Sequence, residues 1–129
     1  MNGIHLAGFS VTVADLDRAA EFYTRGLGLV EKAKEDHDDM HEIMVGGDHD
    51  TTVIVLVHFS SLDQPARAAG DVDKILLQVD DAADTYERAL AQGGTEVKAP
   101  RRIDEARVTF AELRDPDGLL VQLIEHHTE

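Results

Sequence analysis

Histidines are the side chains in this sequence best suited to binding a metal ion or moving a proton near neutral pH, and the chain has seven of them. Most lie in or beside acidic turns or at the C-terminus, where we expect them to be exposed: His37, His41, His49, His126 and His127. His41 and Glu42 are neighbours at the start of a predicted strand, so their side chains point to opposite faces and cannot share an ion. The spacing of these histidines therefore does not predict a metal site.

Two further side chains are candidates for catalysis, His58 and Lys74. His58 ends the apolar run Val53–Val57, where it either acts as a general base at the mouth of a cavity or caps the end of the strand. Lys74 begins another predicted strand. It is a base or Schiff-base nucleophile if it is buried among apolar groups. If it stays charged, it pairs with a carboxylate or phenolate of a ligand, or with an acid such as Asp73 or Glu125.

The bulk composition excludes several classes of function. The chain has no cysteine, which excludes a disulfide framework, a thiolate zinc site and a cysteine nucleophile. No Ser-His-Asp spacing, phosphate-binding loop or metalloprotease motif occurs. With 12 basic and 26 acidic residues the formal net charge is −14, so nucleic acid and membranes are poor partners. We see no long apolar stretch and no signal-peptide pattern, and we expect a soluble, cytoplasmic protein.

The elements that must position the candidate side chains repeat along the chain. Apolar periodicity predicts strands at 4–13, 29–33, 40–45, 51–59, 74–79, 95–98, 106–114 and 119–125, and helices at 16–27 and 82–90. The acidic residues 34–39 are predicted to form a solvated turn. Asp15 and Asp81, each placed to cap a helix, lie 66 residues apart, as do Val13 and Val79. A strand, a helix and three strands therefore occur twice.

This repeat predicts a single α+β domain of two modules. The modules span residues 4–60 and 73–127, with a connection at 61–72. A half-length module cannot bury much apolar surface by itself. We therefore expect the two modules to pack together, either within one chain or across a homodimer.

Two motifs resemble those of one known superfamily. Residues 11–19, VTVADLDRA, with Phe22-Tyr23 and Leu27-Gly28-Leu29, resemble its opening motif, and residues 113–124, LRDPDGLLVQLI, resemble its closing motif. On these residues the chain is identified as a member of the vicinal oxygen chelate superfamily, which includes glyoxalase I, bleomycin-resistance proteins and extradiol dioxygenases. The resemblance implies two tandem βαβββ modules whose curled mixed sheets surround a shared cavity, often in a homodimer.

The resemblance also implies where a catalytic divalent ion would bind. Its ligands would be histidine or glutamate on the first and last strand of each module, and the ion would act as a Lewis acid. The matching positions here carry Gly8, Lys74, Gln122 and either Val55 or Leu56. None is a histidine or a carboxylate, and Gln122 offers only a neutral amide oxygen. We therefore expect a member of the superfamily without a metal or other cofactor.

Strand alternation predicts the side chains that line the cavity. They are Ser10, Thr12, Val55, Val57, Lys74, Leu76, Gln78 and Gln122. This mixture of apolar groups, hydroxyls, amides and one lysine is typical of a small-molecule pocket. The predicted function is metal-independent binding of a small organic molecule, as in resistance proteins that sequester an aromatic natural product or antibiotic. Bleomycin itself is a poor match, because the chain has no Trp and only 5% aromatic residues.

Two enzymatic alternatives stay open at this point. One is a metal-dependent lyase, isomerase or dioxygenase with unusual ligands such as His5, His58 and Glu42. The other is metal-free acid–base catalysis by Lys74 on a polyketide-like substrate. The sequence alone leaves it open whether the protein is an enzyme.

Overall fold

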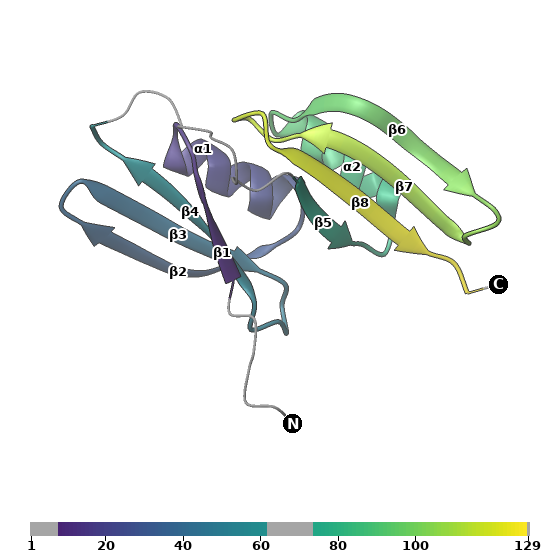
Figure 1. Ribbon diagram of the computed structural model, residues 1–129, viewed down its shortest axis with the longest axis horizontal. Coiled ribbons are helices and arrows are strands. Elements are labelled where there is room, and N and C mark those ends of the chain that lie inside the picture. The colour runs from purple at the N-terminus through teal and green to yellow at the C-terminus, as the bar shows by residue number, and fades with distance from the viewer. Residues whose placement is uncertain (1–7, 62–73, 129) are drawn as a thin grey trace.

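The computed structural model describes residues 8–61 and 74–128, which form two modules of one helical segment and four strands each (Figure 1). The first contains β1 (Gly8–Thr12), α1 (Leu16–Glu21) continuing as a π-helix (Phe22–Gly26), β2 (Val30–His37), β3 (Met40–Gly46) and β4 (Val53–Phe59). The second contains β5 (Lys74–Gln78), α2 (Ala82–Ala91), β6 (Thr95–Ile103), β7 (Val108–Arg114) and β8 (Leu120–His126). The predicted α+β fold of two βαβββ modules is confirmed.

The two sheets have the same topology. Their strand orders are β1-β4-β3-β2 and β5-β8-β7-β6. In each sheet the first and last strands of the module pair in parallel and the other neighbours are antiparallel. β1 and β5 begin 66 residues apart, at Gly8 and Lys74, as the predicted repeat requires.

The helices begin where the sequence predicts. The carboxylate of Asp15 accepts a hydrogen bond from the backbone N–H of Arg18 over 3.1 Å, and that of Asp81 accepts one from Asp84 over 3.0 Å. Each bond satisfies a donor that the first turn of a helix leaves unpaired. The last turn of the first helical segment is wider, because the N–H of Leu27 bonds to the carbonyl of Phe22, five residues earlier.

One continuous core lies between the sheets and the helices. Its largest fully buried side chains are Tyr23, Tyr86, Phe22, Leu56, Leu113, Leu123, Val13, Val45 and Val121. The helices of the two modules pack against each other, and a Cβ on Gly26 would lie 3.2 Å from Cα of Ala89. Within the described residues, no helix is long and apolar enough to cross a membrane.

Two hydrogen bonds tie the opening motif of the first module to the closing turn of the second. The hydroxyl of Tyr23 donates to Oδ2 of Asp115 over 2.7 Å, and both side chains are buried. The backbone N–H of Ala14 donates to Oδ1 of Asp117 over 2.9 Å. The opening and closing motifs of the sequence therefore contact each other, and this contact fixes how the two modules pack together.

The edge strands β2 and β6 are longer than the sequence predicts. β2 continues through residues 34–37, which were wrongly predicted to be a turn, and only Asp38, with φ +43°, and Asp39 lie between it and β3. β6 runs to Ile103 rather than ending at Lys98. Both strands are exposed along almost their whole length and carry charged side chains, as edge strands do. Hydrogen bonds to a single neighbouring strand hold each of them in place. Their side chains do not need to pack on the core, so their sequences show no alternation of apolar and polar residues.

Candidate functional site

Each sheet has one face packed on the helices and another turned away from them. In Figure 1, α2 lies behind the strands of its sheet. Because side chains alternate along a strand, the buried residues Ile75, Val121 and Leu123 face the helix, and their neighbours face the other way. The outward-facing side chains of β5–β8 are here called the C-terminal face.

Strand register arranges the C-terminal face in four rows, of which the fourth holds His126, Val108 and Ile103. The first row holds Lys74, Leu120 and Arg114, the second Leu76, Gln122, Glu112 and Lys98, and the third Gln78, Ile124, Phe110 and Arg101. Four of the predicted lining residues thus lie on this one surface: Lys74, Leu76, Gln78 and Gln122. Leu76 is 59% exposed, which is unusual for a large apolar side chain.

The other four predicted lining residues lie on the equivalent face of the first sheet. Ser10 pairs with Val55, and Thr12 pairs with Val57. Across β3 and β2 the same face continues through Met44 and Ala33, and through Glu42 and Glu35. We call this surface the N-terminal face. The predicted lining residues therefore belong in equal number to the sheets of the two modules.

Two hollows lie at the junction of the modules. One, of about 300 Å³, is lined from both modules by residues that include Phe9, Leu29, Val53, Lys74 and Leu76. The other, of about 430 Å³, is lined about equally by polar and apolar groups and includes Gln78 and Arg88. The first has the size and mostly apolar lining of a small-molecule pocket. Its lining includes two predicted site residues, Lys74 and Leu76.

The superfamily's metal positions do not fit a metal ion in this chain. Ser10 pairs with Val55 as Leu76 pairs with Gln122, so the register identifies Val55 rather than Leu56 as the counterpart of Gln122. Leu56 is fully buried in the core on the opposite face. At Gly8, φ is +152° and any Cβ would collide with the carbonyl oxygen of Val53. The four positions hold a glycine, a valine, a lysine and a glutamine, and no first-strand histidine fits at Gly8.

The predicted catalytic candidates do not meet. His58 lies on the helix side of its sheet, where Nδ1 is 3.2 Å from the carbonyl oxygen of Val13 and the ring stacks 6.4 Å from His41. Lys74 is exposed on the C-terminal face. Glu125, one predicted partner of Lys74, instead accepts a hydrogen bond from the N–H of Ala82 over 2.9 Å. The other predicted partner, Asp73, and the candidate ligand His5 lie outside the described residues.

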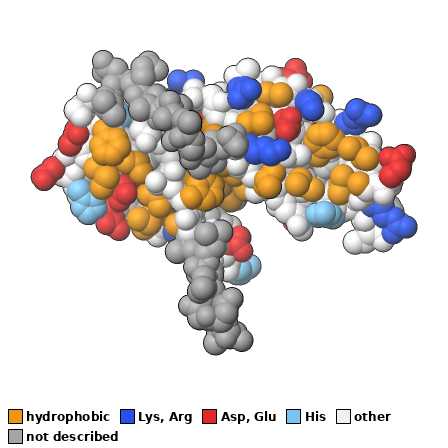
Figure 2. Space-filling view, in the orientation of Figure 1, with side chains coloured by type: hydrophobic (Ala, Val, Ile, Leu, Met, Phe, Trp, Pro, Cys, Tyr) orange, Lys and Arg blue, Asp and Glu red, His pale blue; other side chains and the backbone are white. Residues whose placement is uncertain are grey.

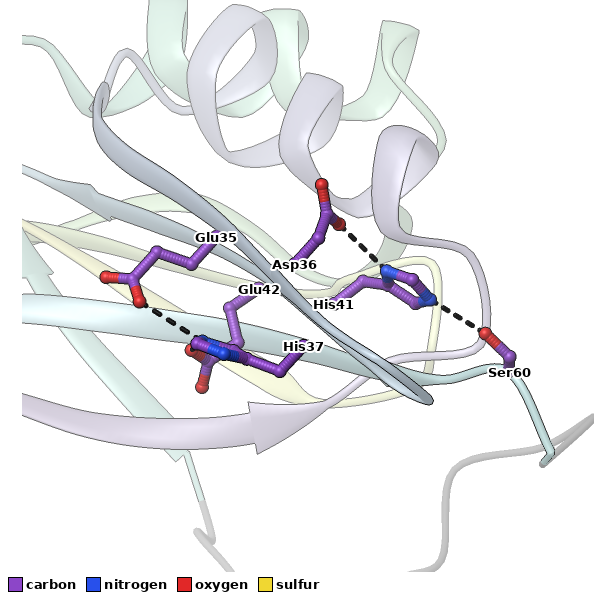
Figure 3. Close-up of polar contacts among 6 residues, drawn as sticks. All are labelled: Glu35, Asp36, His37, His41, Glu42 and Ser60. Atoms are coloured by element: carbon purple, nitrogen blue, oxygen red, sulfur yellow. Dashed lines mark hydrogen bonds and ion pairs between the residues drawn. The ribbon is translucent and has the colours of Figure 1, made fainter.

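Sequence reasoning missed one group of metal-binding side chains on the N-terminal face. Glu35, His37 and Glu42 present three ligand atoms within 4.8 Å of one another, and no other such group occurs among the described residues. His37 Nε2 is 3.1 Å from Glu35 Oε1 and 3.8 Å from Glu42 Oε1 (Figure 3). His41 points elsewhere, between Asp36 and Ser60. The group was missed because it exists only if β2 extends to His37.

Titration differs from ordinary behaviour at one tyrosine of the second module. Burial raises the pKa of Tyr86 to about 12, and a hydrogen bond from its hydroxyl to Oε2 of Glu96, over 2.7 Å, adds to the rise. Tyr86 packs on the helix side of the sheet and does not reach the C-terminal face. Its hydroxyl is therefore a structural group and not part of the candidate site.

Comparison with known families and sequences gives a consistent result. The family model described as "Glyoxalase/Bleomycin resistance protein/Dioxygenase superfamily" matches residues 4–123. A lactoylglutathione lyase of Neisseria meningitidis serogroup A is 27% identical over 118 residues, which cover 88% of this chain and 84% of that protein. A probable chloroplastic lactoylglutathione lyase of Arabidopsis thaliana is 32% identical over 88% of this chain but only 33% of its own length.

Solved structures with the same fold include both an enzyme and a binding protein. Glyoxalase I from Zea mays superposes with a TM-score of 0.81 at 21% identity, covering 96% of this chain, which spans less than half (45%) of the maize protein. TnmS3, an antibiotic binding protein from Streptomyces sp. CB03234, superposes with a TM-score of 0.75 at 25% identity, covering 98% of this chain and 99% of TnmS3.

Proposed function

The chain belongs to the Glyoxalase/Bleomycin resistance protein/Dioxygenase superfamily, and from this premise we propose that it binds a small, largely apolar or aromatic organic molecule without a metal ion. The observation that carries the proposal is the set of residues at the superfamily's metal positions. Gly8, Val55, Lys74 and Gln122 supply no anionic or imidazole ligand, and the backbone at Gly8 excludes one. The biological role would be sequestration by a cytoplasmic homodimer.

The surfaces that remain suit such a ligand. The 300 Å³ hollow between the modules joins Phe9, Leu29 and Val53 to Lys74 and Leu76. Apolar side chains there would bury most of a small molecule, while a few polar groups would orient it. TnmS3, which matches over nearly the full length of both chains, is by its name an antibiotic binding protein. This resemblance supports binding rather than turnover.

Metal analysis and ligand screening of the untagged protein test the proposal together. We expect no stoichiometric divalent ion, and we expect thermal stabilisation by members of a panel of aromatic natural products. A ligand present at 100 times its Kd stabilises the folded state by about 2.7 kcal/mol, which a melting curve resolves readily. A stoichiometric ion, or a panel without any stabilising compound, would contradict the proposal.

A second candidate function is a metal-dependent lyase of the lactoylglutathione lyase type. It is favoured by the names of the relatives at 27% identity and by the group of Glu35, His37 and Glu42. One imidazole and two carboxylates are donors that suit zinc and similar ions. Bound zinc that is lost in Glu42→Gln but kept in Glu31→Gln would support this candidate. Without such an ion, the candidate fails.

A further inference from the structure

The C-terminal face has the opposite charge to the protein as a whole. The chain carries a formal net charge of −14 with only 12 basic residues. Four of those 12 lie on the C-terminal face: Lys74, Lys98, Arg101 and Arg114. Among the register partners that define the face, Glu112 is the only acid. The surface is therefore locally positive, whereas its counterpart on the first sheet carries Glu35 and Glu42.

The positive charge of this face is only partly neutralised. Lys98 Nζ lies 3.9 Å from Glu112 Oε1, and Arg114 donates to the carbonyl oxygen of Gly118 over 3.0 Å. Lys74 and Arg101 form no ion pair with any residue that the structure describes. Charged groups held on a sheet without a partner attract an anion from solution.

The same face exposes apolar surface between its basic groups. Figure 2 shows basic side chains gathered around hydrophobic ones over the second sheet. Leu76 is the most exposed of these, and Leu120, Ile124 and Phe110 are partly exposed beside it. The ammonium of Lys98 lies 6.0 Å from the centre of the Phe110 ring. A flat apolar body on this surface would thus lie within reach of several cations.

We propose that the C-terminal face binds an aromatic anion, that is, a small flat apolar molecule carrying a carboxylate or sulfonate. This inference rests on the proposed small-molecule binding, names the chemical class of the ligand, and extends its site from the 300 Å³ hollow onto the C-terminal face through Lys74 and Leu76, which belong to both. Arg101 stands beside Phe110 in register and presents a planar guanidinium, which pairs with a carboxylate or sulfonate through two hydrogen bonds. Leu76, Ile124 and Phe110 would contact the aromatic body.

Gln122 supplies the polar group at the centre of the face. It lies between Leu76 and Glu112 in register and is partly buried, and its side-chain amide has no hydrogen-bond partner among the residues described here. Its amide N–H groups are free to donate to a ligand oxygen. A neutral or cationic ligand would use this amide but would gain nothing from the four basic side chains.

Two fluorescent dyes that differ by one sulfonate test the inference. The anionic probe is 8-anilinonaphthalene-1-sulfonate and the neutral probe is N-phenyl-1-naphthylamine. We expect the anionic dye to bind more tightly despite the net charge of −14. Arg101→Gln should weaken the anionic dye about 3- to 10-fold, the range for losing one charged contact at a partly exposed site, and should leave the neutral dye nearly unchanged.

The matched control is Arg25→Gln, which removes the same charge from an exposed position on the π-helix of the other module. It should change neither affinity, and circular dichroism should show that both variants are folded. Equal effects of the two variants, or equal loss of both dyes in Arg101→Gln, would overturn the inference. A salt-dependent loss of dimer in Arg101→Gln without dye discrimination would assign the face to a second copy instead. Failure of both dyes to bind would count against the proposed function as well.

Discussion

The hydroxyl of Tyr23 and the carboxylate of Asp115, 92 residues apart in the chain, meet over 2.7 Å in the buried junction between the modules. The other oxygen of Asp115 accepts hydrogen bonds from the backbone N–H groups of Asp117 and Leu119, over 2.9 and 2.8 Å. One carboxylate thus holds the turn before β8 and also joins it to the helical segment of the first module. This relationship links the shape of the turn to the docking of the modules.

Replacing Tyr23 by Phe should destabilise the protein without changing its fold. The substitution removes the hydrogen bond to Asp115 and leaves that buried carboxylate with fewer donors, which costs about 1–3 kcal/mol. Urea denaturation measures the loss. Thr24→Val is a control, because it removes a hydroxyl from the same helical segment whose partner is a carbonyl within one module, Ala20. A Tyr23→Phe variant no less stable than Thr24→Val would contradict the importance of the junction.

The stability of the protein should fall as the pH rises from about 10 to about 12. The folded-state pKa of Tyr86 is raised to about 12 from its ordinary value of 10.0, chiefly by burial and then by Glu96. The unfolded chain therefore loses this proton first, and the contribution of Tyr86 is complete below pH 10 and disappears as the pH passes 12. Urea denaturation at a series of pH values gives the free energy of unfolding, which should depend less on pH in Tyr86→Phe than in the unaltered protein. Identical pH dependence in both proteins would refute the assignment.

Gly8→Ala should be strongly destabilising. Its φ of +152° is unfavourable for alanine, and the new Cβ would collide with the backbone oxygen of Val53 on the paired strand. Gly118→Ala is the matched control, because its φ of +92° carries similar backbone strain but no atom lies within 4 Å of the added Cβ. Backbone strain alone costs about 1–3 kcal/mol, so Gly8→Ala should exceed that figure and Gly118→Ala should stay within it. Similar losses in the two variants would show that β1 shifts to accept the methyl group.

Glu42→Gln should slightly stabilise the metal-free protein. Glu35 and Glu42 are register partners on antiparallel strands, and like charges directly opposite each other are destabilising. Removing one charge at pH 8 in the presence of a chelator should raise the free energy of unfolding by about 0.2–1 kcal/mol. Glu31→Gln, opposite Val45, should have no such effect. A stability loss specific to Glu42→Gln would mean that the carboxylate contributes a favourable contact instead.

Local signals were sufficient for the elements that pack on the core. Asp15 and Asp81 cap the helices as predicted. The alternation in β1 and β5 predicts that Ser10 and Thr12 share one face and that Lys74 and Leu76 share another, and the register places both sets on faces turned away from the helices. The edge strands could not be predicted in full, because their outer side chains meet solvent and show no periodicity.

The candidate site was only partly predictable for the same reason. Lys98 and Arg101 lie on the edge strand β6, which the sequence predicts to end at Lys98. Their position beside Phe110 depends on the register of β6 and β7. The alternation Phe110, Glu112, Arg114 within β7 was the signal that could have shown this face. Whether the lining residues of the two sheets meet in one cavity depends on the docking of the modules, which local patterns do not contain.

The bond between Tyr23 and Asp115 also breaks the symmetry of the repeat. The residue 66 positions after Tyr23 is Ala89, which has no hydroxyl, and the counterpart of Asp115 in the turn before β4 is Asp48. Asp48 is exposed and lines the 430 Å³ hollow, and within the described residues no tyrosine hydroxyl donates to it as Tyr23 does to Asp115. The turn before β8 is bonded to the helical segment of the other module, whereas the structure describes no such bond for Asp48 in the equivalent turn before β4. The two halves are therefore no longer interchangeable: a chain built from two copies of the second half would lack the tyrosine of this bond, because Ala89 stands in its place.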